Sequence, residues 1–324
     1  VNGNPLNNTP EAFASLSREE TVFFIPKIEL GEDKFINKFQ HLFDLPKNIL
    51  LKGHISNLIL NFRDSFKFRA DFEDLSLKSN KFSISGLAGV LQSTHDVYRL
   101  RINTPYLNIS LGALFDSNLI FNNLSSELDL SLIDNKVSIS NSTFKGNYKK
   151  NAIRGEINLY PSPFDDTGDL SFKISANDLD YIDALSLFPN LNYTKLTKVW
   201  LQNSISCGSF QEVSFIYRGP IDNNYVDSSS SFQSKGLINN SCLNVNNVGI
   251  TKINLVANIN NSSFIGEVLD GDLYGSQIKG TVKTFKDKNN YKIELKGNSE
   301  GPLSSILRLA NLNLVFEVEE ESGN

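Results

Sequence analysis

Apolar and polar residues alternate along most of this chain. The run 66–72 reads Phe-Lys-Phe-Arg-Ala-Asp-Phe, and the run 128–132 reads Leu-Asp-Leu-Ser-Leu. Successive side chains of a strand point to opposite faces, so each run predicts a strand with one apolar and one polar face. Similar runs recur at 107–111, 137–139, 170–176, 253–259, 291–295 and 312–318. The pattern predicts a very large sheet that is apolar on one side.

Helical spacing of apolar residues interrupts the strands at four places. We expect short amphipathic helices over 35–43, 181–188, 196–200 and 303–310, the first two ended by Pro46 and Pro189. Strands are expected over 22–30, from 50 to about 160 and from 206 to 295, with a Pro-rich loop at 161–166.

The number of helices limits the possible folds. Four short helices cannot cover the apolar face of more than a dozen strands, so a second sheet, the curling of the sheet on itself, or a ligand must cover it. A β-sandwich is the ordinary solution. For so long and modular a chain we predict a mainly β fold: an elongated, mostly antiparallel, one-sided sheet that curls into a hydrophobic, β-taco-like groove.

The termini differ from the rest of the chain. We expect a linker at 1–20, a β-groove segment at 21–316 and an acidic tail at 317–324, which contains Glu319-Glu320-Glu321. The chain begins at Val1 and contains no Met, so we expect an internal piece of a longer protein. It has no stretch near the ~20 consecutive apolar residues of a membrane-spanning helix.

Composition and motifs argue against nucleic-acid binding and catalysis. The net charge is −5, and no Lys/Arg stripe interleaved with aromatic residues supplies a basic footprint for nucleic acid. His41, His54 and His95 lack metal-ligand spacing, and the adjacent Asp165 and Asp166 are typical of a solvated turn. The glycines form no dinucleotide or phosphate-binding motif. We therefore expect no enzyme activity, no cofactor and no metal.

The only two cysteines, Cys207 and Cys242, lie in strand-like contexts. In an oxidising compartment they could form a disulfide worth roughly 3–4 kcal/mol on chain-entropy grounds. Spacing alone does not bring them together, so we favour two separate small core residues.

Two stretches resemble YhdP-like proteins of the AsmA-like superfamily. One contains Trp200-Leu201, Ile205, Gly208 and Arg218-Gly219. The other is the run 68–77, followed by Ile84-Ser85-Gly86-Leu87-Ala88-Gly89. The similarity extends over about 22–314. The chain departs from the family in having a single Trp and in lacking the family's amino-terminal membrane anchor.

The resemblance implies a bridge-type lipid transfer protein of the Gram-negative cell envelope. Such a protein is anchored in the inner membrane, crosses the periplasm as a β-groove and carries phospholipid to the outer membrane. It implies phospholipid and the two membranes as partners, and no catalytic residues.

The alternating apolar residues are the candidate groove lining. An apolar trough removes the cost of exposing acyl chains to water, ~0.8 kcal/mol per CH₂, and non-directional contact lets a lipid slide. The expected lining residues are Phe66, Phe68, Phe72, Leu107, Ile109, Leu128, Leu130, Leu132, Val137, Ile139, Leu170, Phe172, Ile174, Ile253, Leu255, Ile259, Ile293 and Leu295. The alternative function is a surface adhesin or autotransporter passenger built as a β-solenoid, although a fixed period near 20 residues is missing.

Overall fold

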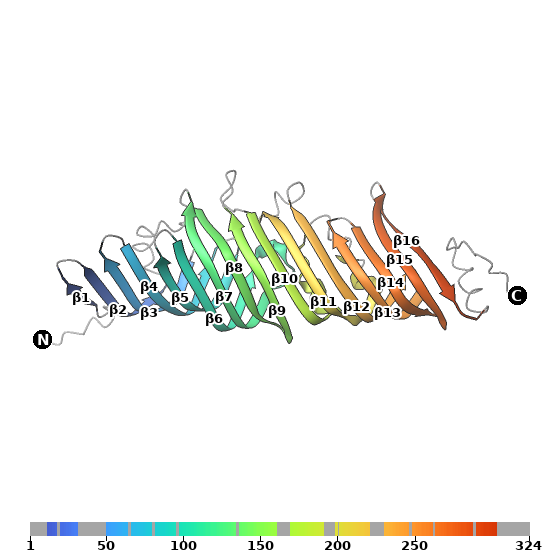
Figure 1. The fold of residues 1–324 in the computed structure, drawn as a ribbon, viewed down its shortest axis with the longest axis horizontal. Helices are drawn as coiled ribbons and strands as arrows, with labels where there is room; N and C mark the ends of the chain where they lie inside the picture. Colours follow the sequence, from blue (N-terminus) through green and yellow to red (C-terminus); the bar gives the residue numbers. More distant parts are fainter. Residues whose placement is uncertain are drawn as a thin grey trace. The chain divides into compact units, whose positions relative to one another are not determined.

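In the computed structural model the described residues form mostly strands. These residues are 12–17, 20–31, 50–63, 66–79, 82–94, 97–133, 136–160, 169–190, 198–199, 201–220, 230–245, 248–261, 263–287 and 290–302. They contain sixteen strands in one open antiparallel sheet, in which each strand lies beside the next in chain order (Figure 1). The predicted mainly β, curled, antiparallel sheet with few helices is confirmed, and the described strands form one sheet rather than a sandwich.

The chain divides into two compact units, which we describe separately. Unit 1 comprises Val1–Ile174 and Arg218–Tyr225, and unit 2 comprises Ser175–Tyr217 and Val226–Asn324. The strands that begin in unit 1 are β1 (Phe13–Leu16), β2 (Thr21–Leu30), β3 (Leu50–Phe62), β4 (Phe66–Lys78), β5 (Ser83–Thr94), β6 (Val97–Ser110), β7 (Leu119–Ile133), β8 (Lys136–Tyr148), β9 (Asn151–Tyr160) and β10 (Asp169–Asp180).

Unit 2 begins at Ser175, within β10, and contains most of the helical residues that the structure describes. Its strands are β11 (Ile205–Pro220, as far as Tyr217), β12 (Ser231–Val245), β13 (Val248–Asn260), β14 (Ser263–Leu273), β15 (Ser276–Asp287) and β16 (Asn290–Glu300). Helix α2 spans Tyr181–Ser186, and residues 198–199 and 201–204 are also helical.

The helical expectations are confirmed where the structure describes the chain. Helices lie at both internal positions expected between β10 and β11, and a short 3₁₀ helix, η1 (Gly112–Leu114), was not expected. The helices expected over 35–43 and 303–310, and the loop at 161–166, lie outside the described residues. The expected linker 1–20 contains strand β1, whose four residues are all exposed. No helix in the described part of the chain is long and apolar enough to cross a membrane.

The strand register places apolar side chains of successive strands of unit 1 in rows on one face, which we call the inner face. One row crosses eight strands through directly paired positions: Ile28, Ile55, Phe72, Gly89, Ile102, Ser126, Phe144 and Gly155. A second row pairs Phe23, Leu60 and Phe68 on β2–β4 and Tyr98, Leu130, Ile139 and Leu159 on β6–β9. Alternation along each strand thus becomes a largely apolar face across the strands, with Ser126 in the first row and Ser93 of β5 beside Tyr98.

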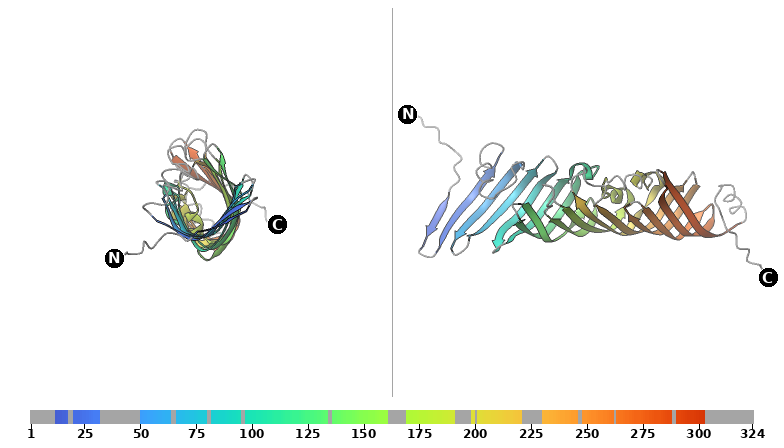
Figure 2. Two further views of the ribbon diagram at one scale, coloured as in Figure 1. Left: turned by 90° about the vertical axis from the view of Figure 1, so that its left-hand side faces the viewer. Right: turned by 90° about the horizontal axis from the view of Figure 1, so that it is seen from above.

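Bulges in the middle of the strands curve this sheet. The register shifts within most of the strand pairs, and the residues with positive φ inside strands include Asn57, Asp74, Asn123, Asn141 and Asn240. Asn and Asp tolerate this left-handed conformation better than other non-glycine residues. A bulge inserts one residue, bends its strand and increases the local twist. Repeated on neighbouring strands, the bulges account for the curvature of the strands in Figure 2.

Each bulge also keeps the apolar side chains on the inner face. On β7 the buried positions are Phe121 and then Leu124, three residues apart, with Asn123 at the bulge between them. On β12 they are Ile238 and then Ser241, with Asn240 between them. The extra residue shifts the phase of alternation by one, and both halves of the strand remain apolar toward the inside.

Candidate functional site

The two apolar rows on the inner face of unit 1 contain no charged residue. Among the described residues of β2–β9, no Asp, Glu, Lys or Arg is paired with a member of the two apolar rows. The charges of β4 and β6 lie on the opposite, outer face: Arg69 pairs with Gln92, and Arg101 pairs with Glu127. The inner rows are therefore apolar apart from the hydroxyl of Ser126 in the first row and that of Ser93 on β5, which pairs with Tyr98. A charge placed in these rows would be costly to desolvate.

Exposure of the inner face differs between the two ends of the strands. Near η1 it is packed: Leu107, Phe121 and Tyr148 are 3%, 5% and 2% exposed, and Leu114 of η1 is also buried. At the other end of the strands, Phe62 and Phe66 flank the β3–β4 turn and are 44% and 42% exposed. The inner face of unit 1 is thus packed beside η1 on β6–β8 and partly exposed at the β3–β4 turn.

Aromatic rings line the open side. Phe62 contacts Phe23 and Phe66, with ring centroids 6.0 Å and 5.0 Å apart, and Phe68 lies 6.0 Å from Phe66 and 5.6 Å from Tyr98. The rings form a continuous series from β2 to β6. The second apolar row continues from Tyr98 to positions 130, 139 and 159, which are all half-buried.

The outer face is held by polar pairs between strands. Arg99 Nε lies 3.1 Å from Asp129 Oδ1, and Asn141 Nδ2 donates to Asp129 Oδ2 at 3.1 Å. The hydrogen bond from Asn141, together with the bond and charge of Arg99, lowers the pKa of Asp129 below its ordinary value, although burial opposes the shift. The bulge residue Asn57 likewise donates to Asp71 Oδ2 at 2.9 Å. Bulge asparagines thus link neighbouring strands on the polar side.

The structure gives different surroundings to the predicted lining residues. Those that are buried are Phe68, Phe72, Leu107, Leu128, Leu170, Phe172, Ile174, Ile253, Leu255 and Ile259. Ile109, Leu130 and Ile139 are half-buried, and Phe66 is exposed. The side chains of Leu132, Val137, Ile293 and Leu295 lie outside the described part of the structure. The register brings the described members on β4–β8 onto the inner face of unit 1, whereas Ile253, Leu255 and Ile259 belong to unit 2.

In unit 2 the inner face is covered by the chain itself. Val213, Phe215 and Phe232 are fully buried, and Leu255 is 2% exposed. Helix α2 lies on the concave side of these strands (Figure 2), and Phe188, which follows it, contacts the rings of Phe215 and Phe232. This part of the expected groove is a packed interior.

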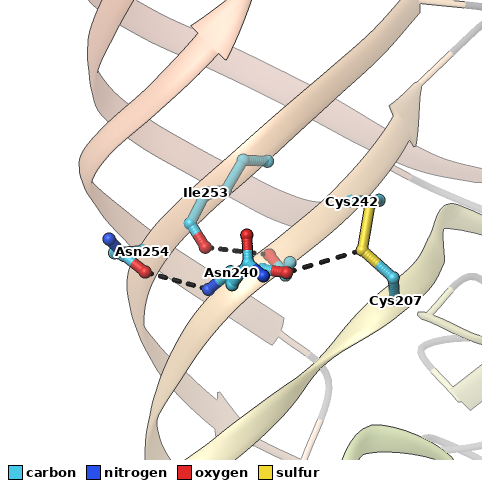
Figure 3. The surroundings of a disulfide bond; sticks show 6 residues. Cys207, Asn240, Cys242, Ile253 and Asn254 are labelled. Atoms are coloured by element: carbon cyan, nitrogen blue, oxygen red, sulfur yellow. Dashed lines mark hydrogen bonds between the residues drawn. A yellow bond between two sulfur atoms is a disulfide. The ribbon is translucent and has the colours of Figure 1, made fainter.

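The preferred interpretation of the cysteines is wrong. Cys207 on β11 and Cys242 on β12 form a disulfide, with Cα atoms 5.0 Å apart (Figure 3). The two strands are antiparallel neighbours, so residues 35 positions apart in sequence become adjacent. Both cysteines are half-buried. Cys242 stands between Ser241 and Leu243, whose side chains are buried on the inner face, so the side chain of Cys242 and the disulfide lie on the outer face. Beside it, the backbone N–H of Asn240 donates to Asn254 Oδ1 at 2.9 Å.

The described residues contain no cluster of side chains that could form a metal site. In the described ranges, no group of three or more His, Cys, Asp or Glu residues is placed to hold a metal ion. Of the three histidines only His54 is described; its Nε2 lies 4.0 Å from Glu29 Oε1 at the surface.

Sequence reasoning missed the bulges and the residues that cover unit 2. A signal was present: Asn or Asp stands at the point where apolar alternation changes phase, as at Asn123 and Asn240. It also missed the close packing at Gly155, which pairs with Phe144: an added Cβ would lie 2.0 Å from the backbone oxygen of Lys173 and 2.6 Å from the ring of Phe144.

Comparison with known proteins identifies no relative: no family model, curated protein or solved structure matches the chain.

Proposed function

We propose that this protein carries phospholipid through the periplasm between the inner and outer membranes, with the acyl chains on the inner face of its sheet. The observation that carries the proposal is the inner face of unit 1, whose two rows of paired residues contain no charge and which is partly exposed at Phe62 and Phe66. Exposed apolar surface flanked by polar residues is a feature of ligand-binding grooves and of protein and membrane interaction sites.

The chemistry of the face suits an acyl chain rather than a polar ligand. Two long acyl chains in water cost on the order of 20 kcal/mol or more, at ~0.8 kcal/mol per CH₂. Successive inner rows present similar apolar atoms, and apolar contact is non-directional, so neighbouring positions of a chain differ little in energy. The headgroup stays in water at the open side, so we expect weak headgroup selectivity.

The disulfide supports an extracytoplasmic location. Disulfides form and persist in oxidising compartments such as the periplasm, and they are rare in the cytosol. Cys207 and Cys242 are paired, and the described residues contain no free cysteine. This agrees with the periplasmic location that the resemblance to YhdP-like proteins implies, with an inner-membrane anchor on the full-length protein.

The adhesin alternative fits the strand order less well. A β-solenoid stacks repeated coils so that equivalent strands of successive repeats pair. Here each strand pairs with its sequence neighbours in an antiparallel meander, and bulges rather than a repeat set the curvature.

The direct test is lipid analysis of the purified full-length protein. We expect organic extraction followed by mass spectrometry to recover phospholipid in a defined ratio to protein, and a matched control protein from the same membrane-free preparation to carry none. Protein that is folded and lipid-free after detergent-free purification would contradict the proposal and favour the adhesin.

A further inference from the structure

A short segment of unit 2, directly after α2, packs on the inner faces of β11 and β12. Leu187 and Phe188, directly after α2, are each 1% exposed. The ring of Phe188 meets Phe215 edge-on with centroids 5.6 Å apart and lies 5.0 Å from the ring of Phe232. An aromatic side chain from the chain itself therefore covers apolar strand residues of β11 and β12.

A buried lysine fastens this segment. Lys198 is 5% exposed, and its Nζ donates to the backbone oxygen of Phe188 at 3.3 Å and to Asn190 Oδ1 at 3.1 Å. Taking an ammonium group out of water is unfavourable unless hydrogen bonds compensate it. An apolar residue would fill the same space without that cost, so the lysine is suited to holding one backbone turn in place rather than to packing.

We propose that residues 181–190, fastened by Lys198, are an internal plug that closes the lipid path in unit 2 and is displaced when acyl chains enter. The inference rests on the proposed function and adds its regulation. Acyl methylenes can replace Phe188 against Phe215 and Phe232, because apolar contact has no directional requirement. A lipid shifts this equilibrium only through its stronger interaction with the open state. The bonds of Lys198 bias the plug toward the closed state.

The test removes the fastening and maps lipid contact in the full-length protein. A diazirine-bearing phenylalanine replaces Phe232 under the plug, and a diazirine-bearing leucine replaces Leu130 on the inner face of unit 1. Each protein is incubated with vesicles of phosphatidylethanolamine and phosphatidylglycerol and irradiated. In Lys198→Met we expect labelling at position 232 to rise at least fivefold over wild type, with labelling at position 130 unchanged.

Two further variants make the result specific. Phe188→Ala keeps the lysine and shortens the plug, and it is also expected to raise labelling at position 232. Lys235→Met, an exposed lysine on the same strand as Phe232, is the matched control and should behave as wild type. Circular dichroism and thermal melting establish that each variant is folded before it is labelled.

The outcomes separate the two proposals. Labelling at position 130 with none at position 232 in either folded plug variant would show that unit 2 is a permanent core and would overturn the plug. Equal labelling at position 232 in wild type and variants would also overturn it. Absence of labelling at both positions would refute lipid binding itself.

Discussion

A charge placed on the inner face is expected to have opposite consequences in the two units. Leu255 is 2% exposed and pairs with Ile238 and Val268, which are buried as well. Leu255→Asp forfeits about 2 kcal/mol of side-chain burial and leaves a carboxyl group unpaired in the interior, at a cost of several kcal/mol more. Against a total stability of about 5–15 kcal/mol, this variant should unfold or be degraded.

Leu130→Arg is expected to spare the fold and block lipid carriage. Leu130 is half-buried, pairs with Tyr98 and Ile139, and lies near the end of β7 at Ile133. Losing half of its burial costs about 1 kcal/mol, and the long arginine stem can cover apolar surface while its charge reaches water. A passing acyl chain cannot avoid the charge.

Urea unfolding and complementation of a deletion strain measure the two effects. The controls introduce the same charges on the outer face, Ser131→Arg beside Leu130 and Asn258→Asp near Leu255, and both should remain stable and active. If Leu130→Arg lowers the free energy of unfolding as much as Leu255→Asp does, the inner face of unit 1 is a closed core and the reasoning fails.

Three further predictions concern the supports of the sheet. Asn141→Val should lower the free energy of unfolding by about 1–3 kcal/mol, measured in urea, because a β-branched residue is strained at φ 50° and the bond to Asp129 is lost. The pKa of Asp129 is lowered, so its contribution to stability is full above its ordinary value of 3.8 and disappears as the pH falls through the lowered pKa. On acidification from pH 5, the melting temperature of Asp129→Asn should therefore fall less than that of wild type. The same dependence of melting temperature on pH in both proteins would contradict this. Replacing Cys207 and Cys242 by Ser opens a link between residues 35 positions apart, and it should cost about 3–4 kcal/mol, read as a lower urea midpoint that reductant reproduces in wild type only.

The fold class could be predicted from the sequence because side-chain alternation is a local property of each strand. The runs at 66–72 and 128–132 lie in β4 and β7, and the apolar side chains that the structure describes in them, from Phe66 to Phe72 and at Leu128 and Leu130, lie on one face. The disulfide could not be predicted in this way, since it depends on the register of β11 against β12, which spacing does not contain.

The alternation of apolar and polar residues also could not predict how deeply each candidate lining residue is buried. Alternation gives Leu130 and Leu255 the same surroundings, and the structure separates them because the chain covers the second and not the first. The cover depends on the long-range contacts of Phe188 with Phe215 and Phe232, which no local periodicity encodes. The bulges are intermediate: Asn123 and Asn141 stand where the alternation changes phase, so a search for phase changes finds them.

Photocrosslinking in cells tests the central claim most directly. A small photoreactive residue is placed in the full-length protein at Leu60, Tyr98 or Leu130 on the inner face, and at Lys67 or Ser131 on the outer face, and the crosslinked protein is analysed for phospholipid. The account predicts lipid adducts at the three inner positions and none at the two outer ones. Equal labelling of both faces, or labelling of the outer face alone, would contradict it.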